Sequence, residues 1–280
     1  MSGAFGCLLL GEECEATRLG DAAQVRGKEA AGERSNSRRL AGQSLVHWVL
    51  RRASEAQQLR GLVVSARPEH ASAAFQQALP GNVCLHVSDA PDAWTRLLDC
   101  QQWLEKQRRE AVTGFVQLRL DCPFVDPCLL DRLVISADRE AQADYATYRS
   151  AREGAVVHAQ IGLMAEYLRV EALRRWNGLA QAGESRRNPG QFLAGRPDEF
   201  HIRLLALPAL LDRDDLRLSV RHVDDWEHAE QIVEALGHDQ LDWQRIVSLL
   251  DTQPALRERM AALNDHERQG QRHSAAATLR

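Results

Sequence analysis

The chain has 280 residues, of which 44% are hydrophobic and 26% charged, and its formal net charge is −4. This balance is typical of a globular protein with a sizeable core and argues against a general nucleic-acid binder, which would carry excess positive charge. No apolar run is long enough for a membrane span or a signal peptide, and the six cysteines form no C-x-x-C pair, so we expect a cytoplasmic protein with reduced thiols and no membrane partner.

The first predicted element is a buried strand over residues 4–10, which ends at Gly11. The segment that follows, 12–39, is a long polar loop with three glycines and six basic residues. Such a loop could wrap a triphosphate with backbone amides and positive charge. A solvated insertion explains the composition equally well, because the segment also carries acids and lacks a G-x-x-x-x-G-K-[ST] pattern.

An amphipathic helix is predicted next, over residues 45–56, followed by a strand over 59–66. Residues 83–87 predict a short strand, and a helix should begin near Pro91.

The central element is the apolar stretch 114–120, which predicts a buried strand that ends in Asp121. Pro123 and Pro127 prevent continued strand pairing, so we expect Asp121 at an exposed turn. Ligands of open α/β sheets bind outside the carboxyl ends of the strands, so Asp121 could hold a cation or a substrate hydroxyl. It could also simply cap its own turn. Asp126, just before Pro127, should cap a helix over 128–137.

The second half of the chain predicts further alternation of strands and helices, and we expect a single domain over residues 1–264 with a disordered tail over 265–280. The expected strands cover 143–148, 197–207 and 216–220, with a further strand within 156–168. The expected helices cover 170–182, 226–236 and 241–250.

Three motifs carry a resemblance to a known family. Asp121-Cys122-Pro123-Phe124-Val125-Asp126-Pro127 resembles the D-C-P-(L/F)-(I/V)-D-P signature of the cytidylyltransferases related to spore-coat polysaccharide and CMP-Kdo synthetase enzymes. Residues 37–45 resemble the family's S-x-R-L-P-G-K-x-L element, and 217–227 its R-L-T-V-D-T-P-E-D-(F/W)-E block. The resemblance covers about residues 5–260 in matching order. It implies an α/β, nucleotide-diphospho-sugar-transferase-like fold (GT-A, Rossmann-like), a three-layer sandwich with a mixed, mostly parallel sheet.

The resemblance also implies a function. Members transfer CMP from CTP to a sugar acceptor for surface polysaccharide biosynthesis, with magnesium, and a homodimer would be usual. Carried over to this chain, Asp121 would be the magnesium ligand and catalytic together with Arg39. The nucleotide would contact Leu10, Gly11, Arg18, Arg39, Gln43 and Ser65, and the acceptor Glu166 and Arg186.

Two departures from the family pattern leave an alternative open. Gln43 replaces a lysine that contacts the phosphates, and Arg221 replaces the second magnesium-binding aspartate. Glutamine cannot neutralise phosphate charge, and a guanidinium cannot ligate a cation. The chain could therefore be a catalytically inactive homologue that binds a nucleotide, a sugar or a partner protein. In the family geometry Arg221 would pair with Asp121 in place of the cation.

Overall fold

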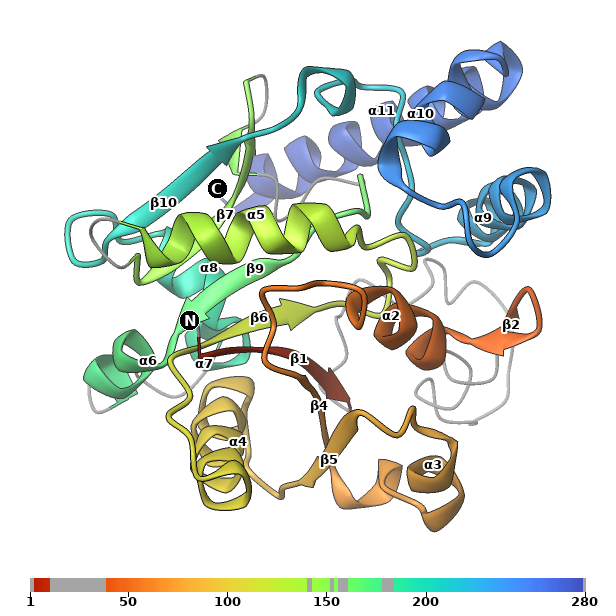
Figure 1. Cartoon of the computed structure of the whole chain (residues 1–280). Coiled ribbons are helices and arrows are strands. Elements are labelled where there is room, and N and C mark those ends of the chain that lie inside the picture. The colour runs from red at the N-terminus through yellow and green to blue at the C-terminus, as the bar shows by residue number, and fades with distance from the viewer. Residues whose placement is uncertain are drawn as a thin grey trace.

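The structure is a computed structural model that describes residues 3–10, 39–139, 143–151, 154–155, 161–177 and 184–278 (Figure 1). The strands are β1 (Ala4–Leu10), β2 (Arg39–Leu40), β3 (Gln43–Ser44), β4 (Leu62–Ala66), β5 (Val83–Val87), β6 (Gly114–Leu118), β7 (Tyr145–Ser150), β8 (Gly154–Ala155), β9 (Glu166–Arg169) and β10 (Ile202–Ala206). The helices are α2 (Leu45–Ala53), α3 (Ala73–Ala78), α4 (Ala93–Arg108), α5 (Pro127–Asp138), α6 (Val170–Asn177), α7 (Glu184–Arg187), α8 (Pro189–Ala194), α9 (Val223–Leu236), α10 (Trp243–Asp251) and α11 (Pro254–Thr278).

The described strands form one large mixed sheet and one small hairpin. The large sheet has the order β10-β7-β9-β6-β1-β4-β5, with β8 paired to β7, and the hairpin joins β2 to β3. The β1, β4, β5 and β6 strands run parallel to their neighbours in this group, whereas β9 is antiparallel to both β6 and β7. This is the mixed, mostly parallel α/β sheet that the sequence predicts.

Hydrophobic cores cover the two faces of this sheet. Along β1 the buried side chains alternate, so that Leu8 and Leu10 join one core while Phe5 and Cys7 join the other. The first core includes side chains from α2, α5, α9, α10 and α11, and the second includes side chains from α4, α6 and α8. The result is a helix–sheet–helix sandwich, which confirms the predicted three layers.

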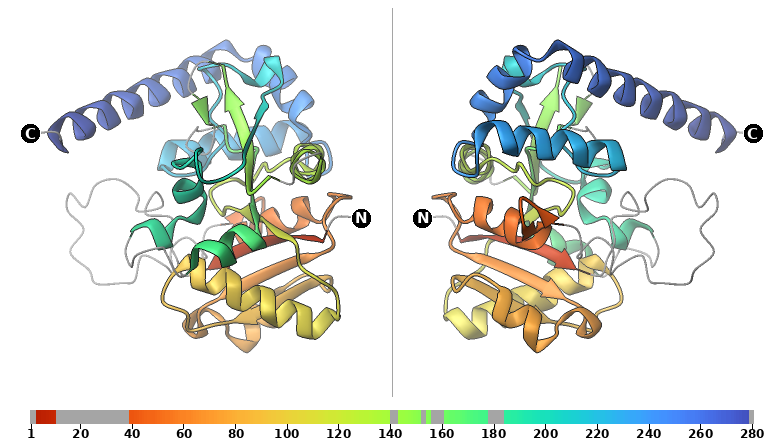
Figure 2. Two further views of the ribbon diagram at one scale, coloured as in Figure 1. Left: turned by 90° about the vertical axis from the view of Figure 1, so that its left-hand side faces the viewer. Right: turned by 90° about the vertical axis from the view of Figure 1, so that its right-hand side faces the viewer.

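Two expectations about the C-terminal part are wrong. Residues 216–220 form no strand; they run beside the turn at Asp121, where the backbone N–H of Val220 donates to the Asp121 carbonyl at 2.8 Å. The expected disordered tail, 265–280, is helical as far as Thr278, because α11 continues through it. Figure 2 shows α11 as one long helix that runs to the C-terminal end of the described chain. Earlier in α11, the buried Met260 joins the first core and the buried Asn264 donates to the carbonyls of Asp214 and Leu216.

No helix in the described ranges is long and apolar enough to cross a bilayer.

Candidate functional site

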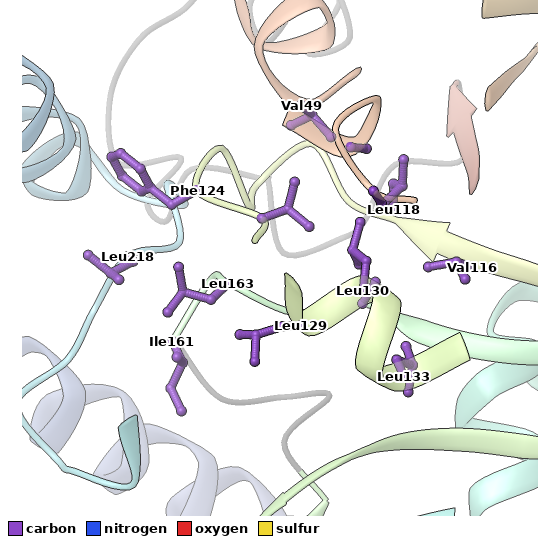
Figure 3. Packing of buried hydrophobic residues seen from close by; sticks show 14 of the residues in the cluster. Val49, Val116, Leu118, Phe124, Leu129, Leu130, Leu133, Ile161, Leu163 and Leu218 are labelled. Carbon is purple, nitrogen blue, oxygen red and sulfur yellow. The ribbon is translucent and has the colours of Figure 1, made fainter. Parts of the chain in front are cut away.

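The turn that carries Asp121 lies at the carboxyl end of β6, next to the parallel strand β1. The turn is held from both sides: the N–H of Asp126 donates to the Leu163 carbonyl at 3.0 Å, and the Asp121 carbonyl accepts from Val220. Leu163 and Leu218 pack near Phe124 in the first core, as Figure 3 shows. Asp126 caps α5 through the N–H groups of Cys128 and Leu129, as predicted.

The Asp121 carboxylate is surrounded by hydrogen-bond donors. Arg119 binds it with both arms of its guanidinium, Nε to Oδ1 at 2.9 Å and Nη2 to Oδ2 at 2.8 Å. Arg221 adds a third guanidinium bond, from Nε to Oδ2 at 2.8 Å. The thiol of Cys122 lies 3.6 Å from Oδ1. The predicted pairing of Arg221 with Asp121 is therefore confirmed.

Asp121 does not lie at an exposed turn, because only 1% of its side chain is accessible. Val220 and Arg221 lie against it, through the Val220 N–H bond to the Asp121 carbonyl and through the Arg221 guanidinium. Burial by itself favours the neutral carboxyl, but Arg119 and Arg221 outweigh it and hold the pKa of Asp121 well below its usual range. The Asp121 carboxyl is thus ionised and buried, and its negative charge is balanced by the two guanidinium groups.

A second layer of charged groups holds Arg221 in place. Its backbone N–H donates to Asp225 at 2.8 Å, and its Nη1 lies 3.5 Å from Oε1 of Glu267 on α11. Arg217, buried beside it, binds Asp225 and donates from Nη1 to Glu267 at 2.9 Å. Asp225 also closes a capping box at the start of α9, so the acid that opens this helix has a structural role, as its position predicts.

These residues do not fit a magnesium ion. Magnesium requires free oxygen ligands in octahedral geometry, whereas the roughly four acceptor sites of the Asp121 carboxylate face three guanidinium N–H groups and a thiol. Within the described ranges, moreover, no three His, Cys, Asp or Glu side chains lie together as a metal site.

Glu166 lies near this turn. It begins β9 opposite Gln117 of β6, two residues before Arg119, and its buried carboxylate accepts from the Tyr145 hydroxyl at 2.8 Å. Burial raises the pKa of Glu166, although the Tyr145 hydrogen bond and the positive charge of Arg119 oppose the shift. The structure thus brings the predicted acceptor residue to the same end of the sheet as Asp121.

Ser65 and Leu10 lie at the carboxyl ends of β4 and β1, where the register pairs Ser65 with Leu9 and Leu10 with Ala66. The Ser65 hydroxyl is fully buried and lies 3.0 Å from Nδ1 of His86 on β5. Burial lowers the pKa of His86, so the neutral ring links Ser65 to Asp99, whose Oδ2 lies 3.5 Å from Nε2. The Leu10 carbonyl accepts from the buried guanidinium of Arg96 at 2.7 Å.

The predicted phosphate residues Arg39 and Gln43 lie on the β2–β3 hairpin. Its turn, Ala41-Gly42, has positive φ at both positions, and the exposed Arg39 donates to the Gly42 carbonyl at 2.9 Å. Arg186, predicted to bind the acceptor, links α7 to the start of α4 through Asp92 at 3.0 Å. Gly11 and Arg18 lie outside the described residues, as does the rest of the 12–38 loop.

The geometry matches a known fold. A solved cytidylyltransferase from Leptospira borgpetersenii superposes with a TM-score of 0.66, at 14% identity over 91% of this chain and 95% of that one. The chain has a cytidylyltransferase fold. A CMP:2-keto-3-deoxy-manno-octonic acid synthetase complexed with CTP gives a TM-score of 0.53 at 12% identity, covering 83% of this chain and 99% of the other. The 4-diphosphocytidyl-2C-methyl-D-erythritol synthase from Anaerococcus prevotii gives 0.54 at 7% identity, covering 83% and 96%.

No protein-family model matches the chain, and no curated protein matches its sequence. At this level of identity, the resemblance to the cytidylyltransferases is confirmed for the fold, and this chain is a divergent example of it.

Three residues that contact site residues were not predicted from the sequence, namely Arg119 at Asp121, Arg96 at the Leu10 carbonyl and Glu267 at Arg221. Arg119 is two positions before Asp121, so the two side chains can point the same way along extended backbone, and that spacing could have predicted the pair. The sequence offers no comparable signal for Arg96 or Glu267, which reach the site from the first turn of α4 and from α11.

Proposed function

We propose that this chain binds CTP at the carboxyl ends of β1, β4 and β6 and transfers its cytidylyl group to a sugar acceptor. The observation that carries the proposal is the pair of guanidinium groups, Arg119 and Arg221, which converge on one buried carboxylate at that end of the sheet. Arginine forks match phosphate oxygens, and the Arg119 side chain is 19% exposed, so an anionic ligand can approach it. The fold is shared with a synthetase whose solved structure contains CTP.

The acceptor would lie near Glu166, which borders the same turn on β9. A sugar offers hydroxyl donors to a buried carboxylate, and the Tyr145 hydroxyl fixes one of its oxygens at 2.8 Å. Surface polysaccharide biosynthesis is the process that the sequence resemblance favours for such a product.

A second candidate is a homologue that binds CTP without turnover. It is favoured by a specific observation, namely that the acceptor sites of Asp121 are already occupied by Arg119, Arg221 and the Cys122 thiol. Together with Gln43 in place of a lysine, this removes electrostatic stabilisation that phosphoryl-transfer chemistry normally uses.

The experiment that tests the proposal is a thermal-shift panel of the four nucleoside triphosphates with the full chain. A ligand that binds only the folded state raises Tm by mass action, so CTP should give a larger shift than ATP, GTP or UTP. Equal shifts for all four, or no shift at millimolar concentration, would overturn it. Pyrophosphate release from CTP with a panel of acidic sugars then separates the candidates: release supports transfer, and binding without release supports the homologue that only binds.

A further inference from the structure

The feature that separates this site from a metal site is the position of Arg221. Its side chain is 9% exposed, and its Nε donates to Oδ2 of Asp121 at 2.8 Å. Arg119 occupies Oδ1 and shares Oδ2. A cation placed beside Asp121 would have to displace one of these groups.

Arg221 is held rigidly enough to act as a fixed charge. Its backbone is fixed by Asp225, and Glu267 lies 3.5 Å from its Nη1. The neighbouring Arg217 is almost fully buried between Asp225 and Asn264, which anchors the whole segment to α9 and α11. Because the segment is bound at both ends, little conformational entropy is lost when a ligand meets the guanidinium.

The charges around Asp121 balance within the cluster, because Arg119, Arg217 and Arg221 face Asp121, Asp225 and Glu267. Asp225 and Glu267 face Arg217 as well as Arg221, whereas Asp121 alone faces both Arg119 and Arg221. The side chain of Arg119 is 19% exposed and so gives the cluster access to solvent. A phosphate group that approaches from solvent would therefore meet Arg119 first and would compete with Asp121 for its guanidinium.

We propose that Arg221 serves as a built-in cation beside Asp121, so that the chain binds the triphosphate of a nucleotide without a divalent metal. This inference rests on the proposed CTP site and adds to it that binding is independent of magnesium. Arg221 and Arg119 contact the phosphates directly. Glu267 is a positioning residue that acts through Arg221.

The test is calorimetric titration of the full chain with CTP, once in excess EDTA and once in millimolar magnesium. We expect the two dissociation constants to agree within about threefold. Binding that is more than about tenfold tighter with magnesium would overturn the inference and leave the proposed CTP site intact. Absence of CTP binding in both buffers would overturn the proposed function and this inference together.

Arg221→Asp is the decisive variant, because it restores a free carboxylate beside Asp121 while Arg119 still pairs with Asp121. Its CTP affinity should fall by about tenfold or more in EDTA and recover when magnesium is added. Equal affinity of the variant and the natural chain in EDTA would contradict the role of Arg221. If Arg221→Asp does not fold, Arg221→Gln decides, since loss of the charge alone should weaken CTP binding in both buffers, and unchanged binding would overturn the inference.

Arg213→Gln is the matched control. Arg213 also bridges two aspartates, Asp215 and Asp251, and its side chain is 19% exposed, but it lies away from the Asp121 turn on the 212–216 segment. This variant should lower Tm without changing the ratio of the CTP affinities in the two buffers. Arg213→Gln therefore separates a general loss of ion pairing from a loss of the fixed cation; a change in its affinity ratio as large as that of Arg221→Asp would count against the inference.

Discussion

Asp121→Asn should destabilise the fold by about 3 kcal/mol, although the two side chains have the same shape. The change removes the negative charge that faces two guanidinium groups and replaces one acceptor oxygen with a donor. Removing one partner of a buried ion pair costs about 3–5 kcal/mol, because the other charge is left buried without compensation. Asp121 and Arg221 are 1% and 9% exposed, but Arg119 is 19% exposed and regains some hydration, which places the expected value at the lower end.

Urea unfolding followed by circular dichroism measures this change as a shift of the midpoint at constant slope. Asp239→Asn is the control, because Asp239 also pairs with an arginine, Arg51, but its side chain is 84% exposed. An exposed pair contributes about 1 kcal/mol at most, so the control should unfold close to the natural chain. If Asp121→Asn lost no more stability than Asp239→Asn, the buried ion pairs of Asp121 would not stabilise the fold by the expected amount.

Three further predictions follow from the same contacts. The pKa of Asp121 is lowered in the folded state, so the stability that Asp121 contributes is present above about pH 4 and is lost as the pH falls below that value. In urea unfolding, the difference in unfolding free energy between the natural chain and Asp121→Asn should therefore shrink on acidification. Gly190→Ala should cost about 1–3 kcal/mol by the same assay, because an added Cβ would overlap the buried carboxylate of Glu166; an unchanged midpoint would mean that α8 moves freely away from β9. Glu267→Gln should cost about 1 kcal/mol, since it weakens the contacts to Arg217 and Arg221, and a loss equal to that of the exposed Asp265→Asn would refute its role in joining α11 to the site.

The strands of the sheet could be predicted from the sequence because their apolar runs are short and interrupted by glycine, proline and acids. The bounds of β1 and β5 agree with the expected 4–10 and 83–87, and β6 ends two residues before the predicted position. Residues 216–220 have the same apolar alternation but form no ladder, because they cover the Asp121 turn instead of joining an edge of the sheet. Alternation of apolar and polar residues predicts which side chains are buried, but it does not predict whether the backbone pairs with another strand.

The α11 helix shows why local composition misled the prediction for the tail. Residues after Asn264 are mostly polar and suggest disorder, yet Glu267 and Arg268 are ion-paired to the 214–221 segment. Helical stability in proteins comes largely from such tertiary contacts and not from propensity. The burial of Asp121 was missed for a related reason, since the segments that cover it are distant in the sequence.

The candidate site was only partly predictable. The pairing of Arg221 with Asp121 followed from one substitution within a recognisable motif, and the structure confirms it. Ser65 was expected among the residues that contact the nucleotide, and the structure adds that its hydroxyl lies against His86 on the neighbouring strand. A cross-strand partner of this kind depends on the register of β4 and β5, and the sequence contains no signal for that register.

The most direct test of the account is a crystal structure of the full chain grown with CTP and manganese, with anomalous diffraction collected to locate the metal. We predict that the triphosphate oxygens accept hydrogen bonds from the Arg119–Arg221 cluster and that Asp121 keeps its guanidinium partners, with no anomalous peak beside its carboxylate. A manganese peak within about 2.2 Å of an Asp121 oxygen, with Arg221 turned away, would contradict the account.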